Sequence, residues 1–130
     1  MSEMLEFADH FFDAVARGDM ALVSDLYRDD VQVWHNWDDR SQDKAENLAT
    51  LAALPQKYDS FEYVDVRRTV VADGFLRQHT IAASRKGRSA RIPAILRVYV
   101  DAGRIYRIEE YFDRGQLNSA LFWGPHRLLE

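Results

Sequence analysis

Residues 61–112 read FEYVDVRRTVVADGFLRQHTIAASRKGRSARIPAILRVYVDAGRIYRIEEYF, and the architecture follows from them. This stretch is rich in β-branched and aromatic residues, which is typical of β-strands. Three dipeptides of the kind found in hairpin turns interrupt it: Asp73-Gly74, Lys86-Gly87 and Ala102-Gly103. We therefore predict four strands that pair in chain order as an antiparallel meander, at about 61–72, 75–84, 89–100 and 104–112.

The sequence before this stretch is patterned for helices. Apolar residues recur at helical spacing in residues 3–17, and Gly18 follows as a stop signal. Asp19 is suited to cap a second, shorter helix, after which a strand is expected at 31–37 and a third helix at 43–54. Helices followed by a run of antiparallel strands indicate an α+β fold. A strongly bent sheet wrapped on these helices would enclose a cone with a pocket inside.

The composition is that of one small globular domain over residues 1–130. Hydrophobic residues make up 47% and charged residues 29%, and no apolar run approaches the roughly 18 residues of a membrane span. A net charge of −4 argues against a nucleic-acid partner. The N-terminus lacks the pattern of a secretory signal, so a cytoplasmic location is expected. The absence of cysteine excludes disulfides, and the four histidines have no metal-ligand spacing, so we expect no metal site.

Alternation along the predicted strands places ionisable side chains inside the cone. One face of a middle strand carries Phe75, Arg77, His79, Ile81 and Ala83. The last strand groups Tyr106, Ile108, Glu110 and Phe112, and the first groups Gln32, Trp34 and Asn36. If these faces are concave, the polar groups converge within an apolar wall that includes Trp34, Ile81 and Phe112.

This set of side chains has a chemical use. A carboxylate at Glu110, kept ionised by Arg77, can act as a general base on a water molecule that Asn36 orients. A protonated His79 can donate a proton to a leaving oxygen. The alternative is that Glu110 and Arg77 form a structural ion pair and that His79 is only hydrogen-bonded.

Two segments resemble a known superfamily. They are Phe11 to Trp37, with Gly18-Asp19, Leu26-Tyr27 and Asp29-Asp30, and Gly103 to Asp113, with the run Glu110-Tyr111-Phe112-Asp113. Both resemble the superfamily of ketosteroid isomerases, SnoaL-like polyketide cyclases and nuclear-transport-factor-two-like proteins. The resemblance implies a cone-shaped, curved antiparallel sheet wrapped on N-terminal helices, a cystatin-like α+β barrel. It also implies a homodimer. The apolar tail with Phe122 and Trp123 is suited either to a dimer contact or to closing the cone.

Within the superfamily, the stretch from Arg77 to Asp113 is most similar to limonene epoxide hydrolase. That family uses a carboxylate–arginine–carboxylate triad, with a tyrosine and an asparagine that place the water. By resemblance, Arg77 falls on the arginine, Glu110 on the general base and Asn36 on the asparagine. His79 stands where the second carboxylate belongs, and Trp34 stands in place of the tyrosine.

The comparison with ketosteroid isomerase suggests another base. Phe11 and Leu96 fall near the positions of that family's two oxyanion-hole donors, whereas His35 aligns with its general-base aspartate when counted from Asp29-Asp30. Regular alternation would put His35 on the face opposite Trp34 and Asn36, and a bulge could turn it into the pocket. Tyr27 and Phe11 are expected to pack as core, with Tyr27 a further candidate for ligand contact.

These observations predict a cofactor-independent acid–base enzyme acting on a small lipophilic molecule in the cone, and hydration of an epoxide is its most specific version. Glu110, Arg77, His79 and Asn36 are the predicted catalytic residues. The predicted substrate-binding residues are Tyr27, Trp34, His35, Ile81, Ile92, Ala94, Leu96 and Phe112. Two alternatives stay open. One is an isomerase, dehydratase or cyclase that uses His79 or His35 as base, and the other is a non-catalytic ligand-binding module, since fold does not determine function.

Overall fold

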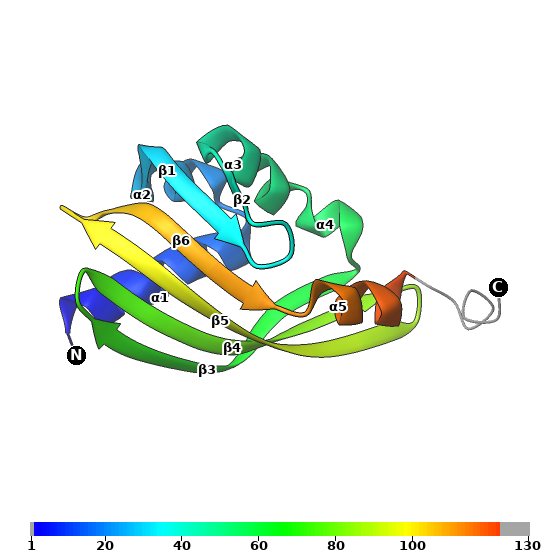
Figure 1. The fold of residues 1–130 in the computed structure, drawn as a ribbon. Coiled ribbons are helices and arrows are strands. Elements are labelled where there is room, and N and C mark those ends of the chain that lie inside the picture. The colour runs from blue at the N-terminus through cyan, green and yellow to red at the C-terminus, as the bar shows by residue number, and fades with distance from the viewer. Residues whose placement is uncertain (1, 123–130) are drawn as a thin grey trace.

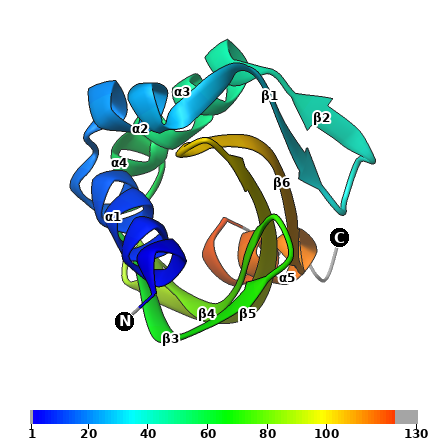
Figure 2. The same cartoon turned by 90° about the vertical axis from the view of Figure 1, so that its left-hand side faces the viewer.

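The structure, a computed structural model, describes residues 2–122. A curved sheet and a group of helices close into a ring around the core, as the view from one end shows (Figure 2). The elements follow in this order: α1 (Glu3–Arg17), α2 (Met20–Leu26), β1 (Tyr27–His35), β2 (Arg40–Gln42), α3 (Lys44–Ala52), α4 (Leu54–Lys57), β3 (Ser60–Val71), β4 (Gly74–Arg85), β5 (Arg88–Asp101), β6 (Arg104–Phe112) and α5 (Arg114–Leu121) (Figure 1). The predicted α+β class is confirmed.

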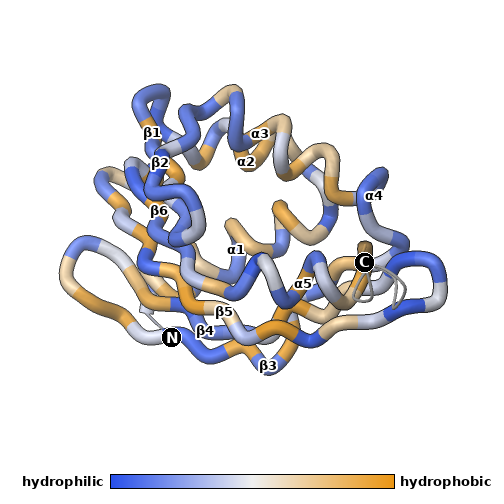
Figure 3. Tube along the Cα trace, turned by 45° about the vertical axis from the view of Figure 1, so that its right-hand side comes forward, coloured by the Kyte–Doolittle hydropathy of each residue, from blue (hydrophilic) through white to orange (hydrophobic). Residues whose placement is uncertain are grey.

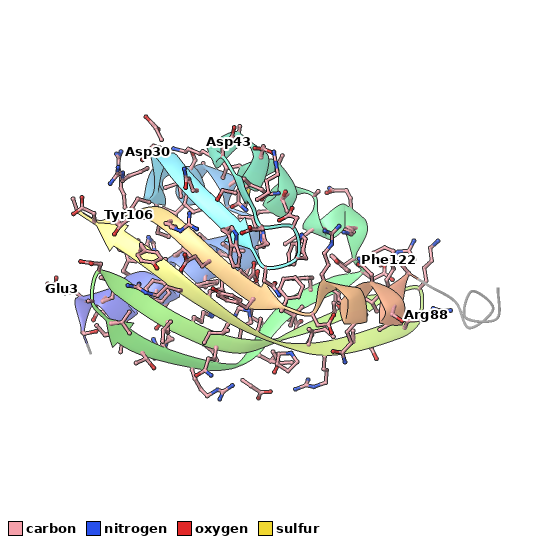
Figure 4. The ribbon with its side chains drawn as sticks, in the orientation of Figure 1. Glu3, Asp30, Asp43, Arg88, Tyr106 and Phe122 are labelled. Carbon is pink, nitrogen blue, oxygen red and sulfur yellow. The ribbon has the colours of Figure 1, made fainter. Side chains whose placement is uncertain are left out.

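The helices begin and end where side chains satisfy their free backbone groups. Ser2 and Asp19 accept hydrogen bonds from backbone N–H groups in the first turns of α1 and α2, and Gly18 ends α1 with a left-handed φ of 72°. Asp43, on the surface at the start of α3 (Figure 4), forms a capping box with Glu46. These caps are local in sequence, and for this reason the starts of all three helices are close to their predicted positions.

The sheet has the strand order β2-β1-β6-β5-β4-β3. Strands β3 to β6 pair antiparallel in chain order, so the predicted meander is confirmed. Strand β1 pairs in parallel with β6, and this pairing sets His35 opposite Glu110. The strand that follows the first two helices therefore lies beside the last strand of the chain.

Two turns show why the glycines stand where they do. Lys86 and Gly87 have φ values of 50° and 79°, as a two-residue hairpin with positive φ at both central positions requires. At Gly74 the reason is close approach, because a Cβ atom there would lie 1.9 Å from the carbonyl oxygen of Val98. Any side chain at residue 74 would push β4 away from β5.

Three elements differ from the sequence-based expectation. Strand β1 begins at Tyr27 and ends at His35, whereas the sequence predicts a strand over 31–37. The short strand β2 is not predicted, because three polar residues carry little strand signal. The helix predicted over 43–54 ends earlier, as α3 at Ala52, and a short helix α4 follows with Pro55 in its first turn, where the missing N–H costs nothing.

The inner face of β4 is as predicted, with Phe75, Arg77, His79, Ile81 and Ala83 buried. The alternation along β4 is one of burial and not of hydropathy, since the hydrophilic Arg77, Gln78 and His79 are consecutive. In Figure 3 the strands of the sheet carry both hydrophobic and hydrophilic residues. The predicted inner face of β1 is wrong. In its second half the buried residues are Val31, Val33 and His35, whereas Gln32 and Asn36, the residue after the strand, are exposed. The two valines carry the apolar period of the strand, so they take the side that faces the core.

Two clusters of buried side chains fill the cone. In the first, Phe11 and Phe12 of α1 pack with Phe75, Leu96 and Val98 of the sheet. In the second, Leu117 and Leu121 of α5 pack with sheet residues that include Ile92. The apolar tail, expected either to close the cone or to form a dimer contact, therefore closes it as far as residue 122. The rest of the tail, Trp123 included, lies outside the described residues.

No helix in residues 2–122 combines the length and the apolar character needed to cross a membrane.

Candidate active site

A cavity of about 350 Å³ opens between the ends of β1 and β6, the start of β3, and helices α3, α4 and α5. Part of its wall is apolar and comes from Leu54, Tyr58, Phe61, Ile81, Phe112 and Leu117. Another part is polar and comes from His35, Gln42, Asn47 and Glu110. An apolar wall with a few convergent polar groups is typical of a site for a small molecule.

The side chains of His35 and Glu110 are in contact in this cavity. Nε2 of His35 lies 3.3 Å from Oε1 of Glu110, and the two side chains are only 10% and 17% exposed. The parallel pairing of β1 with β6 puts the two residues side by side, and the indole of Trp37 stacks on the imidazole at 4.4 Å. An imidazole oriented by a carboxylate can take and return a proton near neutral pH.

Buried polar side chains continue the site on its helical side. The Tyr27 hydroxyl donates to Oδ1 of Asn47 at 2.6 Å, and Nδ2 of Asn47 donates to Oε1 of Gln42 at 2.9 Å. Burial, with smaller contributions from Tyr63 and Glu110, raises the pKa of Tyr27, so the phenol stays protonated. The Tyr27 hydroxyl therefore holds the Asn47 amide in a fixed orientation in the cavity wall.

Sequence reasoning did not find Asn47 and Gln42. The signal for Asn47 is present, because it stands four residues before Leu51 on the stripe of α3 that faces inward. A polar side chain that is buried on an apolar face of a helix needs a hydrogen-bond partner. Gln42 lies on β2, a strand that the sequence does not predict.

Arg77 and His79 form a separate pair. Nε of Arg77 donates to Nδ1 of His79 at 3.0 Å, and the guanidinium carbon lies 3.7 Å from the centre of the Phe12 ring. Burial, and then the charge of Arg77, lowers the pKa of His79 to about 4, so its imidazole is neutral at pH 7. Its Nε2 atom is buried without a hydrogen-bond partner among residues 2–122.

The predicted salt bridge between Arg77 and Glu110 is wrong, since within residues 2–122 the carboxylate of Glu110 contacts the imidazole of His35 instead. Arg77 and Glu110 stand in register on either side of Leu96 of β5, so their backbones are two strand spacings apart, roughly 10 Å. Arg77 turns toward α1 and borders a different groove, lined by Asp9 and other residues of α1 and β3.

Trp34 and Asn36 lie on the outer side of β1, away from the cavity. The Trp34 indole N–H donates to Oδ1 of Asp39 at 2.8 Å, and Oδ1 of Asn36 accepts from the backbone N–H of Phe112 at 3.2 Å. The expectation that they share the pocket with Glu110 is wrong, because His35 takes the inward position of this part of the strand.

The predicted binding residues divide into two groups. His35, Ile81 and Phe112 line the cavity, and Tyr27 supports it through Asn47. Ile92, Ala94 and Leu96 are buried in the two core clusters and do not line it. Helix α5, which the sequence does not predict, covers Ile92 and Ala94 with Leu117 and Leu121.

The part of the chain from residue 2 to 122 contains no group of three His, Cys, Asp or Glu side chains arranged to hold a metal ion.

Comparison with protein families identifies the domain. The model of the SnoaL-like domain matches residues 8–108. The chain belongs to the SnoaL-like domain family. The match runs from the middle of α1 to the middle of β6, so it includes His35 of the candidate pair and ends two residues before Glu110. A comparison with curated proteins found no match to this sequence.

Solved structures show the same fold as this SnoaL-like domain. A candidate polyketide cyclase from Pseudomonas putida is 21% identical, covers 93% of this chain and 98% of its own, and has a TM-score of 0.78. An NTF2-like protein of unknown function from Burkholderia pseudomallei is 17% identical, covers 94% and 99%, and has a TM-score of 0.81. A candidate isomerase from Bacillus subtilis is 17% identical, covers 95% and 98%, and has a TM-score of 0.75.

The family match confirms the predicted superfamily, and the solved structures confirm the cone-shaped fold. At such low identity they carry the fold alone, and the chemistry of this SnoaL-like domain has to be argued from its own side chains.

Proposed function

We propose that this SnoaL-like domain is a cofactor-independent acid–base enzyme in which His35 and Glu110 move a proton on a small organic molecule. The reaction class is that of an isomerase, dehydratase or cyclase. The observation that carries the proposal is the contact of 3.3 Å between His35 and Glu110, largely buried in a cavity of about 350 Å³. An imidazole and a carboxylate in contact inside a cleft can serve as an acid–base pair for proton transfer.

The proposed step begins on a carbon next to a carbonyl group. Nδ1 of His35, the ring nitrogen that does not face Glu110, takes the proton. The C–H bond breaks, and its electron pair moves to the carbonyl oxygen to give an enolate. Glu110 stabilises the imidazolium that forms. The proton returns to another carbon in an isomerisation, or the enolate carbon attacks a second carbonyl in a cyclisation.

Two donors in the wall are suited to the developing negative oxygen. The amide of Asn47 has a second N–H besides the one it gives to Gln42. Tyr63 also lines the cavity, and burial raises the pKa of its phenol, so it stays a donor at neutral pH. Hydrogen bonds to a developing oxyanion contribute strongly when water is excluded.

Hydration of an epoxide fits the geometry less well. That reaction, as the resemblance describes it, needs Arg77 beside Glu110, with Trp34 and Asn36 around a water. None of these three residues lines the cavity. The neutral His79 also lacks the proton that the reaction would require of it.

The proposal is tested by hydrogen exchange at carbon, a step that can be followed whichever product the full reaction gives. A panel of cyclic ketones, with and without a carboxylate group, is incubated with the protein in D₂O and followed by NMR. We expect the wild type to speed deuterium uptake at the α-carbon of at least one ketone. His35→Gln and Glu110→Gln should each slow that exchange by roughly 10²-fold to 10⁴-fold.

Glu109→Gln is the matched control, since Glu109 is the next residue on β6 and its carboxylate accepts from Tyr99 and Arg107 instead. The control should keep the wild-type rate. A non-catalytic binding module would give no exchange above buffer with any ketone, and that result would reject the proposal.

A further inference from the structure

Two cations stand at the mouth of the cavity. Lys57 ends α4 and Arg114 begins α5, and both line the cavity with more exposure than His35 or Glu110. Helices α4 and α5 lie at the same end of the molecule, near the labelled Phe122 (Figures 1 and 4). Two side chains far apart in sequence are thus brought to one opening.

Aromatic rings hold both cations in place. Nζ of Lys57 lies 5.6 Å from the ring centre of Tyr58 and 5.5 Å from that of Phe122. The guanidinium carbon of Arg114 lies 5.1 Å from the ring centre of Trp37, the residue that stacks on His35. Cation–π contacts of this kind restrain a long side chain without neutralising its charge.

Neither cation has a carboxylate partner within residues 2–122. Two carboxylates line the same cavity, but both are otherwise engaged. Glu110 pairs with His35, and Oδ1 of Asp38 accepts from the backbone N–H of Arg40 at 3.2 Å. Partial burial, and then the charge of Arg114, lowers the pKa of Lys57, which indicates that the two cations repel each other. An anion between them would relieve that repulsion.

We propose that the cavity takes a molecule with an apolar body and one carboxylate, which Lys57 and Arg114 bind at the mouth. This inference rests on the proposed function and narrows its substrate from a small lipophilic molecule to an organic acid. The planar guanidinium of Arg114 matches a carboxylate in a two-bond geometry, and Lys57 adds a point charge. The apolar body then lies against Tyr58, Phe61 and Phe112, with its reacting carbon toward His35.

A pair of probes that differ only in charge tests the inference. Titration calorimetry compares 2-naphthoate with 2-naphthamide, whose fused rings suit a cavity of about 350 Å³. We expect the wild type to bind the acid about tenfold more tightly than the amide, a difference of about 1.4 kcal/mol. That preference should weaken as salt is added, because exposed charges are screened.

The variants Lys57→Gln and Arg114→Gln, singly and together, remove the charges. In the double variant the acid should bind no more tightly than the amide. The affinity for the amide should not change, which reports that the cavity is intact. Arg104→Gln is the control, since it removes one exposed cation at the start of β6, away from the cavity, and should keep the preference.

Equal affinities for acid and amide in the wild type, no binding of either probe, or a preference that survives in the double variant would each overturn the inference. This test measures binding and needs no turnover, so its failure can be distinguished from a failure of the proposed function. Glu110→Gln should lose exchange activity yet keep the preference for 2-naphthoate. If the wild type showed no preference for the acid but still catalysed exchange, the proposal of a carboxylate substrate would be rejected and the proposal of proton transfer would remain.

Discussion

The buried His79 makes a quantitative prediction about stability and pH. Its imidazole is 1% exposed, and burial and the charge of Arg77 lower its pKa to about 4, against 6.5 for an ordinary histidine. The titratable groups packed on it are Arg77 on its own strand and Tyr63 on β3. Both keep their protons at neutral pH, so His79 is the group of this cluster that changes charge in the acid range.

The sign of the effect follows from proton binding. Between pH 6.5 and 4 the unfolded chain binds a proton at residue 79 and the folded chain does not. The free energy of unfolding therefore falls as the pH is lowered through this window. The difference between 6.5 and about 4 corresponds to a loss of about 3 kcal/mol at the acid end.

Urea unfolding of wild type and His79→Gln at several pH values between 4 and 8 measures this loss. Glutamine keeps an oxygen to accept from Arg77 and does not titrate. At pH 8 the variant should be less stable, because it loses the ring contacts with Phe12 and Tyr63. The deficit should shrink by about 3 kcal/mol as the pH falls to 4.

His10→Gln, a change at an exposed histidine, is the control and should run parallel to the wild type. If the wild-type and His79→Gln stabilities also run parallel from pH 8 to 4, then His79 titrates normally, and the description of a neutral, buried imidazole is wrong.

Three further predictions concern the fold, the active site and the assembly. Gly74→Ala should lower the free energy of unfolding by more than about 2 kcal/mol, because its Cβ would meet the carbonyl of Val98. Gly87→Ala, with open space around it, should lower the free energy of unfolding by only about 1 kcal/mol, and thermal melting compares the two variants. Arg77→Met should keep the wild-type rate of ketone exchange, since Arg77 borders a different groove. A decrease in the exchange rate as large as that of Glu110→Gln would show that Arg77 belongs to the active site. The homodimer stays a prediction, and light scattering should give twice the mass of one chain, whereas a monomer at high concentration would contradict it.

Local signals are enough to predict much of the fold. The turns at Lys86-Gly87 and Ala102-Gly103 need positive φ values, and the helix caps at Asp19 and Asp43 act within three residues. The alternation of buried side chains along β4 follows from strand geometry alone. These features depend on residues that are neighbours in the sequence, so they can be predicted from the sequence alone.

The candidate site depends on contacts that sequence spacing does not contain. Alternation correctly puts Arg77 and Glu110 on inner faces, but it says nothing of the strand between them or of the turn of Arg77 toward Phe12. The partner of Glu110 comes instead from the parallel pairing of β1 with β6. On β1 the signal is available, because Val31 and Val33 mark the inward face and lead directly to His35.

The proposed chemistry requires His35 and Glu110 to act as one unit. A double-mutant cycle on the exchange rate of the best ketone measures this, with His35→Gln, Glu110→Gln and both changes together. When two residues act in one proton-transfer step, the effects of their substitutions on the rate are strongly non-additive. We predict that the double variant is no slower than the slower single variant, within a few fold. If the two losses multiplied in the double variant, the residues would act independently, which would contradict the proposed mechanism.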